Sequence, residues 1–310
     1  MKKDQVLNGY RVVTRPSNAD AGKCLWAFAE RGGQEYFIKE FLDPKRPRPD
    51  SMGSAEDKRR RYEECMRFEE RHRRVARLLR ADHRSAGNLV LTKDFFAEGT
   101  RYYKVTDRVR GVAARPCELD PAKRVLVLRT LVESLRLLHE CGIVHGDLKP
   151  ENVLLHQPQG SDLLVAKLID FDDSYPAGEP PERGEIGGNP LYGAPEWLRY
   201  LRGDPSVHSG SITAAADMFA FSLLAHVYLC GELPAHPPEH ESPAAAVVAG
   251  VRLTASPRID SRLRPLLDVL TDADPAVRPS AAAAADVLAY LPQPATRPSR
   301  VRSTFGRTGN

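Results

Sequence analysis

The chain has 310 residues, of which 42% are apolar and 28% charged, and its net charge of +4 at pH 7 is too small to indicate a partner. This length suits one large domain or two lobes that share a cleft. No apolar run approaches the roughly 18–20 residues that cross a membrane, and Met1–Gln5 leads into no signal-peptide segment, so no membrane partner is expected. The five cysteines are odd in number and widely spread, which favours reduced thiols in a cytoplasmic protein over a disulfide framework or a zinc site.

The first 40 residues predict strands, because short apolar runs are bounded by turn residues. The run over 24–29 leads to Gly32-Gly33, which is typical of a hairpin turn, and the next apolar run, 36–38, is closed by Lys39. A lysine at the edge of a strand is usually only a solvated charge. The meaning of Lys39 therefore depends on the motifs that follow it in the chain.

A strongly charged helix is expected over about residues 54–80. At 100° per residue, its apolar face gathers five residues: Cys65, Phe68, His72, Val75 and Leu79. Glu69 lies at the edge of this face, whereas Glu70 points nearly opposite. Acidic residues are interleaved with the arginines, so the pattern favours a solvated helix with i,i+4 ion pairs, and no nucleic-acid partner is expected.

Two further strands are predicted at 89–96 and 101–105, and they lead into an extended segment at 106–109. Apolar residues at helical spacing after a proline then predict a helix over 121–141.

Two stretches rich in acids follow, at 145–152 (His-Gly-Asp-Leu-Lys-Pro-Glu-Asn) and 168–172 (Leu-Ile-Asp-Phe-Asp). A buried turn capped by Asp and Asn would explain either stretch alone, but not both in this order. Phosphoryl transfer needs an acceptor held in line, metal ions on the phosphates and positive charge where negative charge develops. Four side chains match these needs: Asp147 as acceptor of a hydroxyl proton, Lys149 as partner of the moving phosphoryl group, and Asn152 and Asp170 as hard oxygen ligands for Mg²⁺.

The remainder of the chain carries three more motifs. The segment 187–196 is rich in glycine and ends in Ala-Pro-Glu, and a helix with Asp217 near its start follows it. Arg278 lies in the late segment Asp-Pro-Ala-Val-Arg-Pro-Ser, before an alanine-rich helix that ends near Leu291. The basic tail, 292–310, is rich in Pro, Arg, Ser and Thr without apolar periodicity and is expected to be disordered.

Taken in order, these motifs resemble the eukaryotic-like serine/threonine protein kinases, and the resemblance covers residues from about 5 to 291. It implies an α+β, two-lobed protein kinase-like domain over 1–291. The N-lobe, about 1–108, would hold an antiparallel sheet and one main helix, and the C-lobe, about 109–291, would be mainly helical. ATP and Mg²⁺ would lie between the lobes.

The resemblance also implies a role for each matching residue. Asp147 would orient the acceptor and take its proton. Lys149 would neutralise the transferring phosphoryl group, and a lysine at this position resembles the serine/threonine kinases more than the tyrosine kinases. By position, Lys39 would contact the phosphates, with Glu69 as its ion-pair partner. The backbone of Asp107 and Val109 would contact the adenine edge. Asn152 and Asp170 would bind the metal. Asp217 is expected to brace the catalytic loop, and Glu196 to form a buried ion pair with Arg278.

Several departures from the family pattern bear on mechanism. The turn at 17–23 has a single glycine where the family has a glycine-rich loop, and Asp20 within it would crowd a triphosphate. Gly146 replaces the arginine that holds a phosphorylated activation loop, and Asn189 takes the place of a threonine, so activation by loop phosphorylation is not expected. Asp172 replaces a glycine and either adds a metal ligand or faces solvent.

Two alternatives remain open. His-Gly-Asp and Ile-Asp-Phe-Asp-Asp are also typical of the aminoglycoside phosphotransferase-like kinases, which phosphorylate small molecules on the same fold, although Asp217 and Arg278 belong to the protein kinase pattern. The glycine-poor turn also suggests a pseudokinase that acts as a scaffold. For an active protein kinase, the partner is a protein with a Ser or Thr hydroxyl, and Ser299, Ser303 and Thr304 are candidate autophosphorylation sites.

Overall fold

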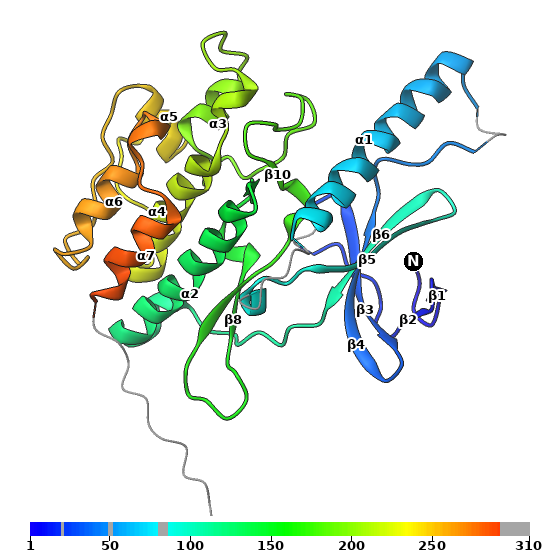
Figure 1. Cartoon of the computed structure of the whole chain (residues 1–310), viewed down its shortest axis with the longest axis horizontal. Coiled ribbons are helices and arrows are strands. Elements are labelled where there is room, and N and C mark those ends of the chain that lie inside the picture. The colour runs from blue at the N-terminus through cyan, green and yellow to red at the C-terminus, as the bar shows by residue number, and fades with distance from the viewer. Residues whose placement is uncertain (20–21, 49–51, 80–85, 292–310) are drawn as a thin grey trace, which may run out of the picture.

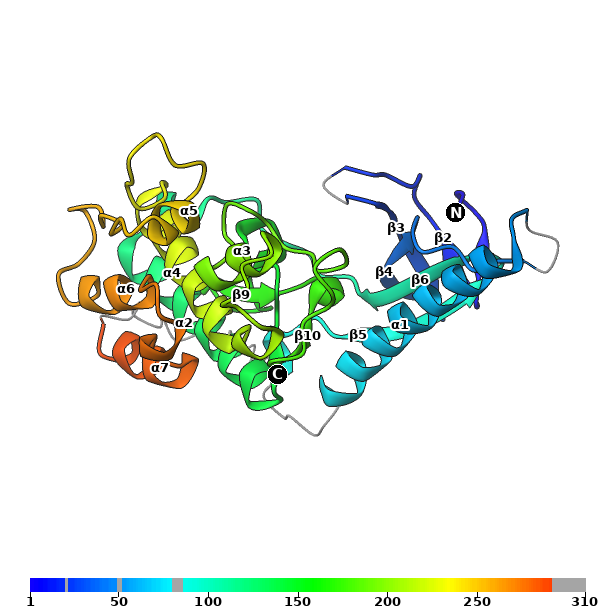
Figure 2. The same ribbon diagram turned by 90° about the horizontal axis from the view of Figure 1, so that it is seen from above.

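The chain forms two lobes in the computed structural model, which describes residues 1–19, 22–48, 52–79 and 86–291 (Figure 1). One lobe contains the large sheet and helix α1, and helices α2 to α7 gather in the other, as the view in Figure 2 also shows. The predicted α+β, two-lobed fold is confirmed. The tail predicted to be disordered lies outside the described residues, as do Asp20 and the candidate sites at Ser299, Ser303 and Thr304.

The N-lobe sheet is antiparallel, with the strand order β1-β2-β3-β4-β6-β5. Its strands are β1 (Val6–Leu7), β2 (Tyr10–Val12), β3 (Cys24–Arg31), β4 (Gln34–Phe41), β5 (Thr92–Glu98) and β6 (Arg101–Asp107). Gly32 and Gly33, both at positive φ, form the β3–β4 turn, so the predicted hairpin is confirmed. Lys39 on β4 is paired with Trp26 on β3 and with Lys104 on β6. Because directly opposite residues in a sheet point to the same face, this register places two lysines side by side.

Helix α1 (Ala55–Leu79) packs one face against the sheet. Its buried side chains are the five predicted from the helical period, together with Glu69. Phe68 packs among aromatic rings of the sheet at centroid distances of 5.0, 6.0 and 5.1 Å: Phe41, Phe95 and Tyr102. The exposed face carries i,i+4 ion pairs such as Arg59–Glu63, as the charge pattern predicts.

The C-lobe core is centred on helices α2 and α4, which contact each other. Its helices are α2 (Pro121–Glu140), α3 (Pro195–Leu201), α4 (Ala214–Cys230), α5 (Pro243–Val248), α6 (Arg264–Leu270) and α7 (Ala281–Ala289). Helix α2 begins with a proline after Asp120, whose side chain accepts a hydrogen bond from the backbone N–H of Lys123. Helix α4 is apolar on all sides because it is buried along most of its length. In the described part of the chain, no helix is both long and apolar enough to span a bilayer.

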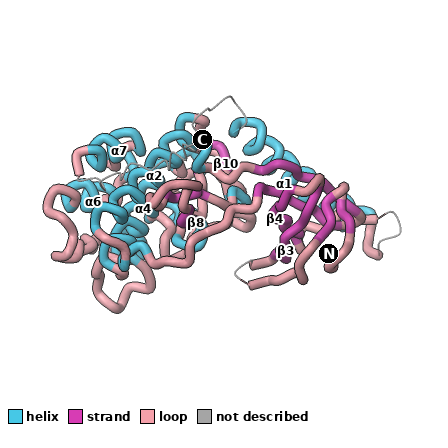
Figure 3. Tube along the Cα trace, turned by 90° about the horizontal axis from the view of Figure 1, so that it is seen from below, coloured by secondary structure: helices cyan, strands magenta, loops and turns pink. Residues whose placement is uncertain are grey.

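Two short antiparallel ribbons fix the two motif loops (Figure 3). Strand β7 (Ile143–Val144) pairs with β10 (Tyr175–Pro176), and β8 (Val153–His156) pairs with β9 (Val165–Leu168). Since β7 and β8 flank residues 145–152 while β9 and β10 flank residues 169–174, the two loops must lie side by side. Short 3₁₀ helices complete the connections: Ala86–Asn88, Pro116–Glu118, Pro150–Asn152, Phe171–Asp173, Ser209–Ser211 and Pro275–Val277.

Candidate active site

Asp147 lies on the loop after β7 with one carboxylate oxygen held and the other free. Its Oδ2 atom accepts hydrogen bonds from Lys149 Nζ at 2.6 Å and from Asn152 Nδ2 at 3.0 Å. Its Oδ1 atom is buried and has no hydrogen-bond partner among the described residues. A buried acceptor without a partner is costly, so Oδ1 is suited to accept a hydrogen bond from a bound hydroxyl group.

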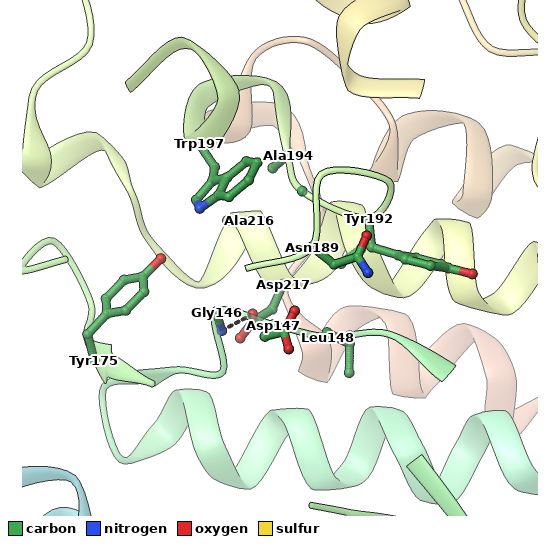
Figure 4. Close-up of a pocket in the computed structure, with 12 residues that line it drawn as sticks. Gly146, Asp147, Leu148, Tyr175, Asn189, Tyr192, Ala194, Trp197, Ala216 and Asp217 are labelled. Atoms are coloured by element: carbon green, nitrogen blue, oxygen red, sulfur yellow. Dashed lines mark hydrogen bonds between the residues drawn. The ribbon is translucent and has the colours of Figure 1, made fainter. Parts of the chain in front are cut away.

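The backbone of this loop is braced from α4. Asp217 accepts hydrogen bonds from the backbone N–H groups of His145 at 2.7 Å and Gly146 at 3.1 Å, the latter drawn in Figure 4, and from His139 Nε2 at 2.9 Å. Burial alone would raise the pKa of Asp217, but the hydrogen bond and charge of His139, with His145, lower it below its ordinary value. The predicted bracing role of Asp217 is confirmed.

Asp170 and Lys39 meet across the two lobes. Lys39 Nζ donates to both oxygens of Asp170, at 2.8 and 2.7 Å, and to Oδ2 of Asp172 at 2.7 Å. Burial would lower the pKa of Lys39, but Asp172 and Asp170 together raise it above its ordinary value, so Lys39 stays charged. Asp170 has left-handed backbone angles (φ 63°, ψ 71°), a conformation that aspartate tolerates better than most residues.

The predicted ion pair between Lys39 and Glu69 is not formed. Glu69 is buried, as expected, but its carboxylate accepts from the Tyr102 hydroxyl at 2.7 Å and pairs with Arg73 at 2.8 Å. Lys39 instead forms ion pairs with Asp170 and Asp172, which follow β9. This correction has a physical reason: β6 places Tyr102 opposite the glutamate, and the loop after β9 brings two closer carboxylates to the lysine.

Asp172 is mostly enclosed, and its carboxylate is not free as a ligand. It lies between Lys39 and Lys104 and contacts both. Burial would raise its pKa, but Lys104 and Lys39 hold the pKa well below the ordinary value. Lys104 belongs to none of the sequence motifs, although a lysine inside the apolar run of β6 is a signal that could have indicated its role.

A cavity of about 260 Å³ lies between the lobes. It is lined by Lys39, Lys104 and Asp170, and by Asp107 and Val109, whose backbone is predicted to contact the adenine edge. The rest of its wall is largely apolar: Trp26, Phe28, Phe37, Val90, Thr106, Leu154 and Ile169. The Trp26 and Phe37 rings are stacked, with centroids 5.7 Å apart and planes at 24°. The structure thus brings the predicted base-binding and phosphate-binding residues together, and adds aromatic residues that were not predicted.

A second cavity, of about 410 Å³, adjoins the first and is lined by the acidic residues. Lys39 and Asp170 line both cavities, and Asp147, Lys149 and Asp173 line only the second. Burial, with the neighbouring carboxylates of Asp172, Asp147 and Asp170, raises the pKa of Asp173 to about 6. Both positive and negative groups therefore line this cavity.

The donor set fits a magnesium ion that is shared with a ligand. Asn152 uses Nδ2 for its hydrogen bonds to Asp147, which leaves Oδ1 for a metal, and Asp170 offers a carboxylate. Among the described residues, no group of three or more His, Cys, Asp or Glu side chains is arranged to hold a metal ion. Magnesium commonly binds one or two protein oxygens and completes its shell with phosphate and water, so Asn152 and Asp170 suffice.

The end of the segment 187–196 packs beside the catalytic loop around a small cavity (Figure 4). Asn189, Tyr192 and Trp197 line it together with Asp147. Gly146 has φ +80°, and a Cβ atom there would lie 2.6 Å from the carbonyl oxygen of Asp173. The glycine that replaces the family arginine is therefore required by this backbone.

Glu196, the last residue of the Ala-Pro-Glu motif, pairs with Arg278 as predicted. The guanidinium donates to both carboxylate oxygens, at 2.7 and 2.8 Å, and both side chains are buried.

A family model described as "Protein kinase domain" matches residues 22–288, and the chain belongs to this family. It is 28% identical to testis-specific serine/threonine-protein kinase 3 of Mus musculus over 88% of the chain and 92% of that protein. It is 29% identical to serine/threonine-protein kinase pkn2 of Myxococcus xanthus over 76% of the chain, and 34% identical to a probable myosin light chain kinase of Dictyostelium discoideum over 47% of the chain. These alignments cover only 31% and 46% of the last two relatives. The similarity is to serine/threonine protein kinases.

Proposed function

We propose that this protein transfers the γ-phosphoryl group of ATP to serine or threonine hydroxyls of protein substrates, in a reaction that requires Mg²⁺. The observation that carries the proposal is the state of Asp147: one carboxylate oxygen is held by Lys149 and Asn152, and the other is buried and unpartnered beside a cavity that Lys39 and Asp170 share. Catalysis of phosphoryl transfer is mostly positioning and electrostatic stabilisation, and this arrangement offers both.

The residues divide the work between acceptor and donor. The free Oδ1 of Asp147 orients the acceptor hydroxyl and takes its proton, and Lys149, 2.6 Å from the other oxygen, neutralises charge on the transferring group. Lys39 holds the phosphates. A magnesium ion, when bound by Asn152 and Asp170, neutralises further phosphate charge.

The interlobe cavity is assigned to the adenine ring. Its wall of Trp26, Phe28 and Phe37 offers aromatic faces for a planar base, and the backbone at Asp107 and Val109 supplies the edge contacts. An apolar slot with a few polar groups at one end is the usual form of a nucleotide-base site.

Activity without phosphorylation of the segment 170–196 is part of the proposal. Gly146 has no side chain that could hold a phosphate, and Asn189 uses its side chain to accept the N–H of Leu191 at 2.8 Å. Two carboxylates of this segment already pair with arginines of α1: Glu185 with Arg67 and Glu179 with Arg74, at 2.8 and 2.6 Å. These pairs supply the negative charge that a phosphate would otherwise bring.

The proposal places the protein in the cytoplasm on the basis of its cysteines. All five are described and none of them forms a disulfide, which supports a reducing, cytoplasmic compartment. Autophosphorylation at Ser299, Ser303 and Thr304 belongs to the same proposal, because each lies near arginines in the tail.

Transfer of labelled γ-phosphate from ATP and Mg²⁺ to the protein itself and to a generic basic protein tests the proposal. Asp147→Asn should abolish label on serine and threonine, whereas the matched control Asp162→Asn, on an exposed loop, should not. ATP binding without label on any protein would refute protein substrates and favour a small-molecule acceptor. Absence of ATP binding would favour the scaffold.

A further inference from the structure

Four charged side chains form a cluster between the sheet and the loop after β9: Lys39, Lys104, Asp170 and Asp172. Lys39 Nζ lies 2.7 Å from Oδ2 of Asp172 and 2.7 Å from Oδ2 of Asp170. Lys104 Nζ contacts the other oxygen of Asp172 and lies 3.5 Å from Oδ1 of Asp170. The Asp172 carboxylate therefore bridges two lysines on neighbouring strands.

The four side chains differ in depth. Lys104 is 5% exposed, Lys39 9% and Asp172 15%, whereas Asp170 is 31% exposed. Asp170 is the most exposed member and, like Lys39, lines both cavities, whereas Lys104 lines only the first and Asp172 only the second. Because a buried charge is tolerated only when it is paired, Lys104 and Asp172 require each other.

The charges of the cluster balance, with two lysines and two aspartates. In the proposed function Asp170 turns to Mg²⁺, and Asp172 is then the carboxylate that remains on Lys39. Alone, Asp172 would cancel the charge that Lys39 needs for the phosphates. Lys104 restores it, because Lys39, Lys104 and Asp172 together keep a net charge of one positive unit.

Glu69 of α1 does not fix the position of Lys39 in this structure. Glu69 is occupied by the Tyr102 hydroxyl and Arg73, at 2.7 and 2.8 Å. We infer that Asp172, balanced by Lys104, is the positioning residue for Lys39 and takes the place that the family pattern gives to Glu69. This inference rests on the proposed function, since it requires that Lys39 holds nucleotide phosphates.

Binding of adenosine and of ATP, the latter as a non-hydrolysable analogue with Mg²⁺, to the full chain is measured by calorimetry and tests the charge balance. Lys104→Met removes one positive charge beside Lys39 but keeps an apolar side chain in the cavity wall, so it should weaken ATP binding about tenfold and leave adenosine binding within about twofold. Lys104→Arg should bind ATP like the unmodified chain. Asp172→Asn should not weaken ATP binding, because it removes a negative charge. The double variant Lys104→Met with Asp172→Asn restores the balance and should recover most of the lost affinity.

Phosphoryl transfer tests the positioning. Asp172→Asn should lower kcat about 10- to 100-fold without raising KM for ATP. Lys39 loses the carboxylate that fixes its position, whereas the positive charges of Lys39 and Lys104 remain. Glu69→Gln should change kcat less than Asp172→Asn. Glu70→Gln, on the opposite face of the same helix, serves as the matched control.

The outcomes separate this inference from the proposed function. Equal loss of ATP and adenosine binding in Lys104→Met, or a larger loss of kcat in Glu69→Gln than in Asp172→Asn, would overturn the inference while leaving the kinase activity intact. An unmodified chain that binds ATP but transfers no phosphate would refute the proposed function. The difference between ATP and adenosine binding would still decide the role of Lys104. A chain that does not bind ATP would end both.

Discussion

The buried guanidinium of Arg278 and the carboxylate of Glu196 form a bidentate ion pair that joins the end of the segment 170–196 to the loop after α6. Arg278 also donates to the backbone carbonyls of Asp272 and Ala215, at 2.9 and 3.0 Å. Its side chain is fully buried and that of Glu196 is 4% exposed. The pair therefore fixes segments that are more than 80 residues apart in the sequence.

Loss of one member of this pair should be strongly destabilising. Arg278→Met leaves the Glu196 carboxylate buried without a partner, so we expect the free energy of unfolding to fall by about 3–5 kcal/mol in urea denaturation. Glu196→Gln with Arg278→Met removes both charges and should cost less than the sum of the single variants. Additive losses would contradict a direct pair.

Gly146 should tolerate no side chain. Gly146→Ala combines an unfavourable positive φ with a Cβ atom 2.6 Å from the Asp173 carbonyl oxygen and 3.0 Å from the Tyr175 ring. Gly142→Ala is the matched control, since Gly142 has φ +69° but open space around its Cβ position. Both should lose about 1–2 kcal/mol from the left-handed backbone, and Gly146→Ala should lose measurably more by chemical denaturation. Equal losses would show that the Asp173 carbonyl moves freely.

The sequence predicts local features of this fold well because they depend on short-range periodicity. The apolar face of α1, from Cys65 to Leu79, follows from the helical repeat alone. The contacts of Asp217 and the Glu196–Arg278 pair followed from the ordered motifs, because the fold brings motif residues to the same places.

The contacts that the sequence did not predict depend on strand register. Lys39 and Lys104 are neighbours only because β4 pairs with β6, strands separated by α1 and β5 in the chain. Glu69 lies on the buried face of α1, as its helical angle predicts, but its carboxylate accepts a hydrogen bond from Tyr102 of the same β6 strand instead of pairing with Lys39. The partners of Asp172 and Glu69 depend on which side chains of β6 lie next to them. The periodicity of the sequence does not predict how distant strands pair, so it could not predict these partners.

Trp26 should report nucleotide binding by its fluorescence. The chain has two tryptophans: Trp26 lines the interlobe cavity, and Trp197 lies by the small cavity near Asp147. A base stacked in the interlobe cavity should quench Trp26, so adenosine should change the emission of the Trp197→Phe variant. The same titration should leave the emission of Trp26→Phe nearly constant. Quenching that persists in Trp26→Phe would place the base elsewhere.

His72 should make the protein sensitive to mild acid. It is buried among the aromatic rings of Phe41, Phe68 and Phe95, and burial, opposed by Asp172, lowers its pKa to about 3. The unfolded chain binds a proton near pH 6.5 and the folded chain does not, so stability falls as the pH drops below 6.5. Between pH 7 and 5 the free energy of unfolding should decrease by about 2 kcal/mol from this group alone. Urea denaturation of His72→Leu, which keeps an apolar side chain without a titrating ring, should lack that part of the decrease. A parallel pH dependence in both proteins would refute the role of His72.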